Sequence, residues 1–238
     1  FDYFFEEYLQ GEGEMDQELA TLIEKAGSKK SSLELLAYMR AHKVRRPDLV
    51  FKYGVKLLNS SLGDEVWTIY EQVFMASLDL GEQEVANHAL NALKKKFPGS
   101  SRVKRLAGLY EESEENYPQA EALYAELLAA NPANTLALKR RAAVELARGR
   151  PAAAARALGD YLRDFPADVA AWEQLLAVHL GVGGLAGARF CLEELLLAEP
   201  GRPRHHRRLA ELLYTQAQGE DARGAEALLR RARRHLCR

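Results

Sequence analysis

The sequence predicts an all-α fold of stacked helix–turn–helix repeats, chiefly because residues recur along it at a spacing of 34. Four prolines keep this interval: Pro98, Pro132, Pro166 and Pro200. Four alanines keep it twelve residues upstream: Ala86, Ala120, Ala154 and Ala188. No segment shows the two-residue alternation that is typical of a half-buried strand. A repeat of this length is one helix pair, which buries its apolar face only against its neighbours.

The second helix of each repeat carries a constant apolar stripe. Counted from Trp67, Ser101, Thr135 and Val169, place 20 is always Ala, and places 24 and 27 are always Leu or Tyr. Offsets of four and three residues put these side chains on one helical face, and Pro at place 32 ends the helix. The pattern is typical of tetratricopeptide (TPR) repeats, so we predict a TPR α-solenoid of about five to six helix pairs.

The repeats are expected at 67–100, 101–134, 135–168, 169–202 and 203–238, with no domain boundary inside the array. The first helices are less regular, since Lys104 and Arg141 stand where an apolar residue is usual. The last repeat fits only with about three residues inserted around 218–221, so that Ala225, Leu229 and Ala232 form its stripe.

Upstream, residues 31–66 read as one degenerate helix pair that caps the array. We expect helices over Leu33–His42 and Pro47–Asn59, with Ser32 as the N-cap of the first and Pro47 in the first turn of the second. Residues 1–30 form an acidic, aromatic arm, which we expect to be flexible. The alternative is that this arm docks on a basic surface of its own or another molecule.

Composition favours a soluble protein in a reducing compartment. Hydrophobic residues make up 47% and charged residues 28% of the 238 residues. No apolar run approaches the roughly 18 residues that span a bilayer, and the first ten residues do not resemble a secretory signal. Two cysteines, Cys191 and Cys237, imply no disulfide framework. Cys191 falls inside a second helix, where we expect a buried thiol.

Motifs that suggest an enzyme fail in their context. The glycine-rich run 181–187 follows a helix, whereas a dinucleotide site needs a preceding strand. His205 and His206, with His235 or Cys237, would make a poor metal site because adjacent helical residues point about 100° apart. The acid pairs 111–112 and 193–194 are expected to be exposed helix residues. We therefore predict no catalytic, cofactor-binding or metal site, and no enzyme.

Two basic clusters are the candidate functional residues. They occupy equivalent places in the first helices of neighbouring repeats, and first helices line the inner face of a TPR array. We predict a basic strip that binds an acidic segment or a phosphate-rich surface, with scattered solvated charge as the alternative. The six residues of the predicted strip are Arg102, Lys104, Arg105, Lys139, Arg140 and Arg141.

Several segments lie largely outside the TPR consensus and point to one family. They are 63–73 (GDEVWTIYEQV), 97–106 (FPGSSRVKRL), 131–135 (NPANT), 190–195 (FCLEEL) and 214–216 (YTQ). In these segments the chain resembles subunit 2 of the endoplasmic reticulum (ER) membrane protein complex, over about residues 31–236. Residues 1–30 show no such resemblance.

The resemblance implies a non-catalytic scaffold on the cytoplasmic face of the ER membrane. Family members hold cytosolic segments of membrane subunits 3 and 5, and pair with globular subunit 8 or 9, in a complex that inserts tail-anchored and multipass proteins. Membrane association would be indirect and peripheral, with no nucleic-acid partner. It also implies that Lys139, Arg140 and Arg141 match a basic run at the cytosolic face. A co-chaperone-type TPR adaptor is the alternative. Its carboxylate clamp needs Asn near places 6 and 9, whereas place 9 of this chain holds Leu109, Ala143 and Ala177.

Overall fold

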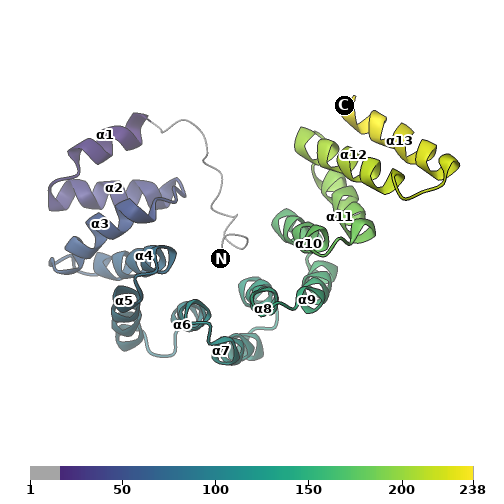
Figure 1. Cartoon of the computed structure of the whole chain (residues 1–238). Coiled ribbons are helices and arrows are strands. Elements are labelled where there is room, and N and C mark those ends of the chain that lie inside the picture. The colour runs from purple at the N-terminus through teal and green to yellow at the C-terminus, as the bar shows by residue number, and fades with distance from the viewer. Residues whose placement is uncertain (1–16, 238) are drawn as a thin grey trace. The chain divides into compact units, whose positions relative to one another are not determined.

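The computed structural model describes residues 17–237, and every regular element in that range is an α-helix (Figure 1). The chain divides into two compact units, of which the first ends at Ala137 and the second begins at Leu138. This boundary differs from our expectation of an undivided array. A stack of repeats can divide in this way because each pair contacts only its neighbours and no common core joins distant pairs.

The first unit contains an extra N-terminal helix followed by three helix pairs. Its helices are α1 (Gln17–Lys25), α2 (Lys29–Ala41), α3 (Pro47–Leu58), α4 (Glu65–Leu80), α5 (Gln83–Lys96), α6 (Ser101–Ser113) and α7 (Tyr117–Ala130). The boundary falls within α8 (Thr135–Ala147). The second unit continues with α9 (Pro151–Asp164), α10 (Val169–Gly181), α11 (Leu185–Ala198), α12 (Pro203–Ala217) and α13 (Ala222–Leu236). The all-α TPR prediction is confirmed, and four first helices begin where the repeats were predicted to begin.

The predicted stripe forms the contacts within and between helix pairs. Its twelve residues are all at most 4% exposed: Ala86, Leu90, Leu93, Ala120, Tyr124, Leu127, Ala154, Leu158, Tyr161, Ala188, Leu192 and Leu195. The small alanine lets a neighbouring helix approach, and the larger residues fill the space beyond it. The 34-residue spacing therefore reflects the packing of successive helix pairs.

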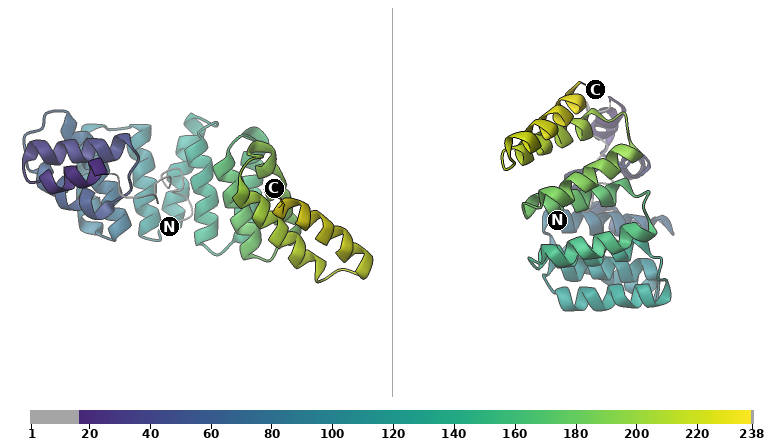
Figure 2. Two further views of the ribbon diagram at one scale, coloured as in Figure 1. Left: turned by 90° about the horizontal axis from the view of Figure 1, so that it is seen from above. Right: turned by 90° about the vertical axis from the view of Figure 1, so that its right-hand side faces the viewer.

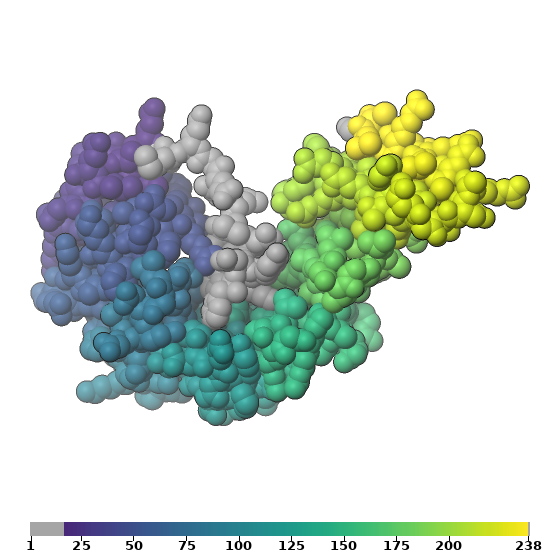
Figure 3. Space-filling view, viewed as in Figure 1, coloured from purple at the N-terminus to yellow at the C-terminus, as the bar shows by residue number. Residues whose placement is uncertain are grey.

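The last helix pair departs from this pattern. Helices α12 and α13 lie side by side (Figures 2 and 3), joined by a turn at the predicted insertion. Of the three expected stripe residues in α13, only Ala232 is buried, whereas Leu229 is 40% exposed. Ala225 is half-buried, so this stripe is less well covered than the stripes of the other repeats.

The turn inside each of the first five helix pairs, from α2–α3 to α10–α11, passes through a left-handed residue. Glycine takes this conformation after α4, α8 and α10, with φ between 71° and 75° at Gly81, Gly149 and Gly183. Lys43 after α2 and Glu115 after α6 adopt it without being glycine, with φ of 54° and 58°. An L-residue pays roughly 1–2 kcal/mol for this conformation.

The N-terminal helices differ from the prediction in two respects. Residues 17–25, expected to belong to a flexible arm, form α1, because Leu19 is buried and Leu22 and Ile23 pack beside it. The N-cap of α2 is Ser28 and not Ser32, which is itself buried inside the helix. Ser28 and Ser31 cap each other, since each side chain accepts a backbone N–H of the other. The docking or flexibility of residues 1–16 lies outside the described residues.

Candidate partner-binding surface

The first basic cluster lies on α6 and divides between two acidic partners. Arg102 is exposed and forms a two-point ion pair with Glu71 of α4, with Nε–Oε1 at 2.9 Å and Nη2–Oε2 at 2.7 Å. Arg105 also approaches Glu71, at 3.8 Å. Lys104 instead pairs with Glu126 of α7 at 2.8 Å. The structure thus brings Arg102 and Arg105 together over one carboxylate, while Lys104 lies against another helix.

The second cluster lies on α8, in the other unit, and Lys139 is not a surface residue. Its Nζ lies 3.1 Å from the Oδ2 atom of Asp168, and the residue is only 8% exposed. We expected the charges of the predicted strip to be exposed, and this expectation is wrong for Lys139. The side chain is buried because its ammonium also lies over the Tyr161 ring, 6.0 Å from the ring centroid.

Asp168 joins three helices through its carboxylate. It is the N-cap of α10 and accepts the N–H of Ala171 at 3.0 Å. It also accepts the Tyr161 hydroxyl of α9 at 2.6 Å and the Lys139 ammonium of α8. Burial acts to raise the pKa of Asp168, but the bonds from Tyr161, Ala171 and Lys139 outweigh it, so the pKa lies below its ordinary value. Lys139 is therefore a structural residue of the second unit.

Arg141 is the member of the second cluster that remains at the surface. It is exposed, and no ion pair to it is found within residues 17–237, while Arg140 beside it is half-buried. Of the six predicted residues, Arg102 and Arg141 are the exposed ones. A partner that binds the first helices can reach these two most easily.

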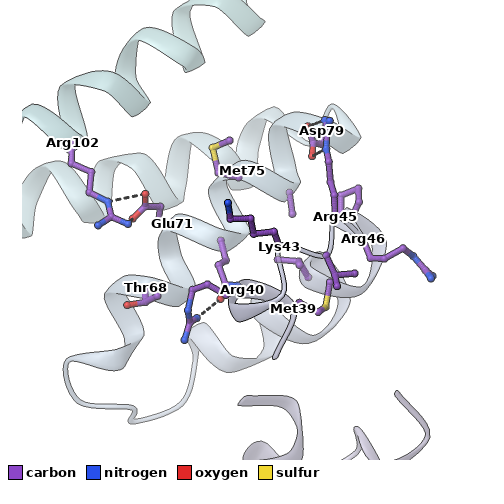
Figure 4. Close-up of a pocket in the computed structure, with 15 residues that line it drawn as sticks. Met39, Arg40, Lys43, Arg45, Arg46, Thr68, Glu71, Met75, Asp79 and Arg102 are labelled. Carbon is purple, nitrogen blue, oxygen red and sulfur yellow. Dashed lines mark hydrogen bonds and ion pairs between the residues drawn. The ribbon is translucent and has the colours of Figure 1, made fainter. Parts of the chain in front are cut away.

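A pocket of about 290 Å³ lies on the first-helix side of the first unit, next to Arg102 (Figure 4). Its walls come from the end of α2, the α2–α3 turn, the start of α3, and α4, with Arg102 added from α6. Its apolar lining consists of Met39, Val44, Pro47, Val50, Met75 and Ala76. Its polar lining consists of Arg40, Lys43, Arg45, Arg46, Thr68, Glu71, Gln72, Asp79 and Arg102. The surface around Arg102 is thus a hollow with an apolar interior and a basic rim.

Sequence reasoning missed this pocket, although its signal is visible in the chain. Four basic residues occur between positions 40 and 46, where one helix ends and the next begins. The structure shows that Arg45 forms a two-point pair with Asp79, at 2.7 and 3.2 Å. Arg40 donates to the side-chain oxygen of Gln72 at 2.9 Å. These contacts hold the basic rim against α4.

The residues considered for catalysis or metal binding have other roles. His206 donates from Nε2 to the Pro200 carbonyl at 2.8 Å, and its Nδ1 lies 3.0 Å from that of His235. His205 is fully buried beside Glu199. Within residues 17–237, no group of three or more metal-ligating side chains is found. The glycine-rich run 181–187 forms the α10–α11 turn and the start of α11, as its repeat register indicated.

Two further side chains are buried. Glu112, expected to be an exposed acid, is 4% exposed and accepts the Tyr124 hydroxyl at 2.5 Å. The expectation that the acids at 111–112 are exposed is therefore wrong for Glu112. Cys191 is buried as expected, and burial raises the pKa of its thiol to about 12. Neither group is accessible to a substrate.

The described helices include none that is both long and apolar enough to cross a membrane. Their accessible features are a basic-rimmed pocket and Arg102 on the first unit, and Arg141 on the second unit.

The helix pairs and their buried stripes define a TPR protein. Among solved structures, a TPR protein from Thermus thermophilus has a similar fold, with a TM-score of 0.57 and 17% identity, covering 78% of this chain and 99% of that one. This likeness concerns the fold alone.

The chain belongs to a particular TPR family. The model of the EMC2 TPR-like repeat domain matches residues 83–220. ER membrane protein complex subunit 2 of Xenopus tropicalis is 42% identical over 180 residues, covering 74% of this chain and 61% of the relative. The subunit 2 of Dictyostelium discoideum is 33% identical over 172 residues, covering 70% of this chain and 53% of the relative. The chain thus spans about three-fifths or less of the length of these relatives.

Proposed function

We propose that this chain is a non-catalytic scaffold subunit of the ER membrane protein complex. The family match carries the proposal, because the relatives named above bear this subunit's name. In this role the chain lies peripherally at the cytoplasmic face of the ER. It supports insertion of tail-anchored and multipass membrane proteins by holding segments of other subunits, without performing the insertion itself.

The first-helix side supplies a surface suited to that role. Arg102 and the basic-rimmed pocket are accessible on the first unit and Arg141 on the second, while the apolar stripes are buried in helix packing. Cytosolic segments of membrane subunits 3 and 5 are the proposed ligands, with globular subunit 8 or 9 as a further partner. The proposed partner-binding residues remain those of the predicted strip, except that Lys139 acts through its buried pair with Asp168.

A co-chaperone-type adaptor is less well supported by the geometry. A clamp for a terminal carboxylate needs polar side chains that are accessible on the first helices. At place 9, where such a clamp would need Asn, Leu109 and Ala143 are buried, with exposed fractions of 6% and 7%. Those positions serve packing and have no hydrogen-bonding group to offer.

Affinity purification tests the proposal. The tagged chain is expressed in its source cells, membranes are solubilised in mild detergent, and co-purifying proteins are identified by mass spectrometry. We expect the other subunits of the complex to be recovered with the chain. Recovery of chaperones instead, without these subunits, would support the adaptor and contradict the scaffold proposal.

A second measurement tests the peripheral location. Alkaline carbonate strips peripheral proteins from membranes and leaves bilayer-spanning proteins behind. We expect the chain in the supernatant and the membrane subunits in the pellet. A chain that stays in the pellet would contradict peripheral attachment.

A further inference from the structure

The pocket in the first unit has more positive charge than its own carboxylates can neutralise. Five basic side chains and two carboxylates line it. Both carboxylates are already engaged, Asp79 by Arg45 and Glu71 by Arg102. For Lys43 and Arg40, no ion pair is found within the described chain. The pocket therefore offers at least two cationic groups to an incoming anion.

Lys43 is held over the pocket by an unfavourable backbone conformation. Its φ of 54° is one that glycine adopts in three equivalent turns of this chain. Figure 4 shows its side chain reaching from the α2–α3 turn toward the helix that carries Glu71 and Met75. Strained residues are concentrated at functional sites, where the side chain and its position matter more than the local stability. A lysine at this place gives the pocket an ammonium group, which glycine would not.

The apolar interior of the pocket favours a ligand in which an apolar side chain lies next to the anionic group. Met39 and Ala76 are buried beneath it, and Val44 and Met75 line its sides, half-exposed to solvent. A bare anion at the rim would leave these groups in contact with water, whereas an apolar side chain next to the anion would cover them. Methionine adapts to side chains of different shape, so Met39 and Met75 do not require one particular apolar residue in the ligand.

We infer that this pocket binds a peptide segment of a partner protein through an Asp or Glu flanked by apolar residues. The carboxylate pairs with Lys43 and Arg40, and an adjacent apolar side chain enters the space between Met39 and Met75. This inference rests on the proposed function, in which the first helices hold segments of other subunits, and it specifies the chemistry of one such segment.

Zero-length crosslinking tests the inference in the intact assembly. A water-soluble carbodiimide joins a lysine amine to a carboxylate only where the two are in direct contact. Permeabilised cells that express the tagged chain are treated, and the linked peptides are identified after purification. We expect Lys43 to be joined to an Asp or Glu of another protein, next to apolar residues. Lys56, exposed on α3 outside the pocket, is the control for non-specific linking.

Three results would overturn the inference. Lys43 could remain unlinked while other exposed lysines react, or it could be no more reactive toward partners than Lys56. A link from Lys43 to Asp2, Glu6 or Glu7 would assign the pocket to the acidic arm of the chain itself. Recovery of the complex without a partner link at Lys43 would contradict the inference about the pocket and leave the proposed function standing. A link to an acidic, apolar segment of an unrelated protein supports the pocket chemistry but contradicts the proposed function.

A pair of glycine variants supplies the matched control. Lys43→Gly and Glu115→Gly both relieve a left-handed residue in an equivalent turn, but only the first removes charge from the pocket. The crosslinked segment is synthesised and its affinity is measured for both variants. We expect roughly fivefold weaker binding by Lys43→Gly and unchanged binding by Glu115→Gly, as for the loss of one partly exposed ion pair. Equal affinities would overturn the role of Lys43.

Discussion

At the scale of single residues, Asp168 is the charged group that links three helices of the second unit. One carboxylate caps α10 and accepts hydrogen bonds from Tyr161 and Lys139, so that α8, α9 and α10 meet at one group. Such a buried pair is costly to break, because the charge left behind has neither water nor a partner. The three basic residues of α8 therefore differ: Lys139 is structural, Arg140 is half-buried and Arg141 is exposed.

Reversing the charges of Lys139 and Arg141 separately tests this difference. Lys139→Glu places a second carboxylate beside Asp168 and should destabilise the protein by roughly 3–5 kcal/mol, as for other broken buried pairs. Arg141→Glu changes an exposed side chain and should alter the free energy of unfolding by no more than about 0.5 kcal/mol. Urea unfolding of both variants measures the difference. Equal, small effects would show that Lys139 is not buried in solution.

The pH dependence of stability gives a second test of the same carboxylate. In the unfolded chain the pKa of Asp168 lies near 3.9, and in the folded chain it lies lower. As the pH falls through the interval between the two values, the unfolded state binds more protons and stability is lost. This contribution is complete above the unfolded pKa.

Asp168→Asn removes the ionisable group and so isolates this contribution. The variant should be less stable than the parent at neutral pH, and the difference should shrink as the pH falls below about 4. Urea unfolding across this range, under matched salt, provides the measurement. A difference that stays constant with pH would mean that the charge of Asp168 contributes nothing to folding.

At the scale of helices, the repeat is maintained by small residues where two helices approach each other. A Cβ atom added to Gly108 of α6 would lie 2.6 Å from the ring of Tyr124 on α7. Tyr124 is fully buried and its hydroxyl bonds to Glu112, so the ring has little room to move. A Cβ atom at Gly159 in α9 would meet nothing within 4 Å.

This contrast predicts opposite effects of the same substitution. Gly108→Ala should destabilise by roughly 1–3 kcal/mol through overpacking, despite the better helix propensity of alanine. Gly159→Ala should stabilise by about 0.5–1 kcal/mol, because only propensity and chain entropy change. Thermal or urea unfolding measures both. A stabilising Gly108→Ala would show that α6 and α7 lie farther apart than the structure indicates.

The helices that could be predicted from the sequence are those in which the same residue types recur every 34 residues. The proline at place 32 and the stripe of alanine, leucine and tyrosine mark the second helices, and each of those stripes is buried. The first helices carry a weaker apolar pattern, so the burial of Lys139 could not be read from it. Its partner, Asp168, lies 29 residues away in sequence, and only packing brings the two together. The Ser28 cap was missed because Ser28, Ser31 and Ser32 all fit the N-cap preference and only the hydrogen bonds distinguish them.

At the scale of the whole chain, the pocket and the unit boundary could not be predicted from the sequence. The basic residues at 40–46 have no special spacing, and they form a pocket only because the α2–α3 turn lies against α4 and beside Arg102. The boundary near Ala137 has no sequence signal either, since the 34-residue period continues through it. The family resemblance concerned residues 31–236, and the family model matches 83–220 within that range.

The proposed scaffold holds partner subunits through its first helices, and charge reversal on those helices tests this most directly. Recovery of these subunits is compared between the parent chain, a variant with Arg102→Glu and Arg141→Glu, and a control with Arg230→Glu, Arg231→Glu and Arg233→Glu. The first variant reverses the two exposed members of the predicted strip, and the control reverses a similar set of charges on α13. We expect a loss of about threefold or more for the first variant and near-normal recovery for the control, with both variants folded. Normal recovery for the first variant, or an equal loss for both, would contradict this expectation.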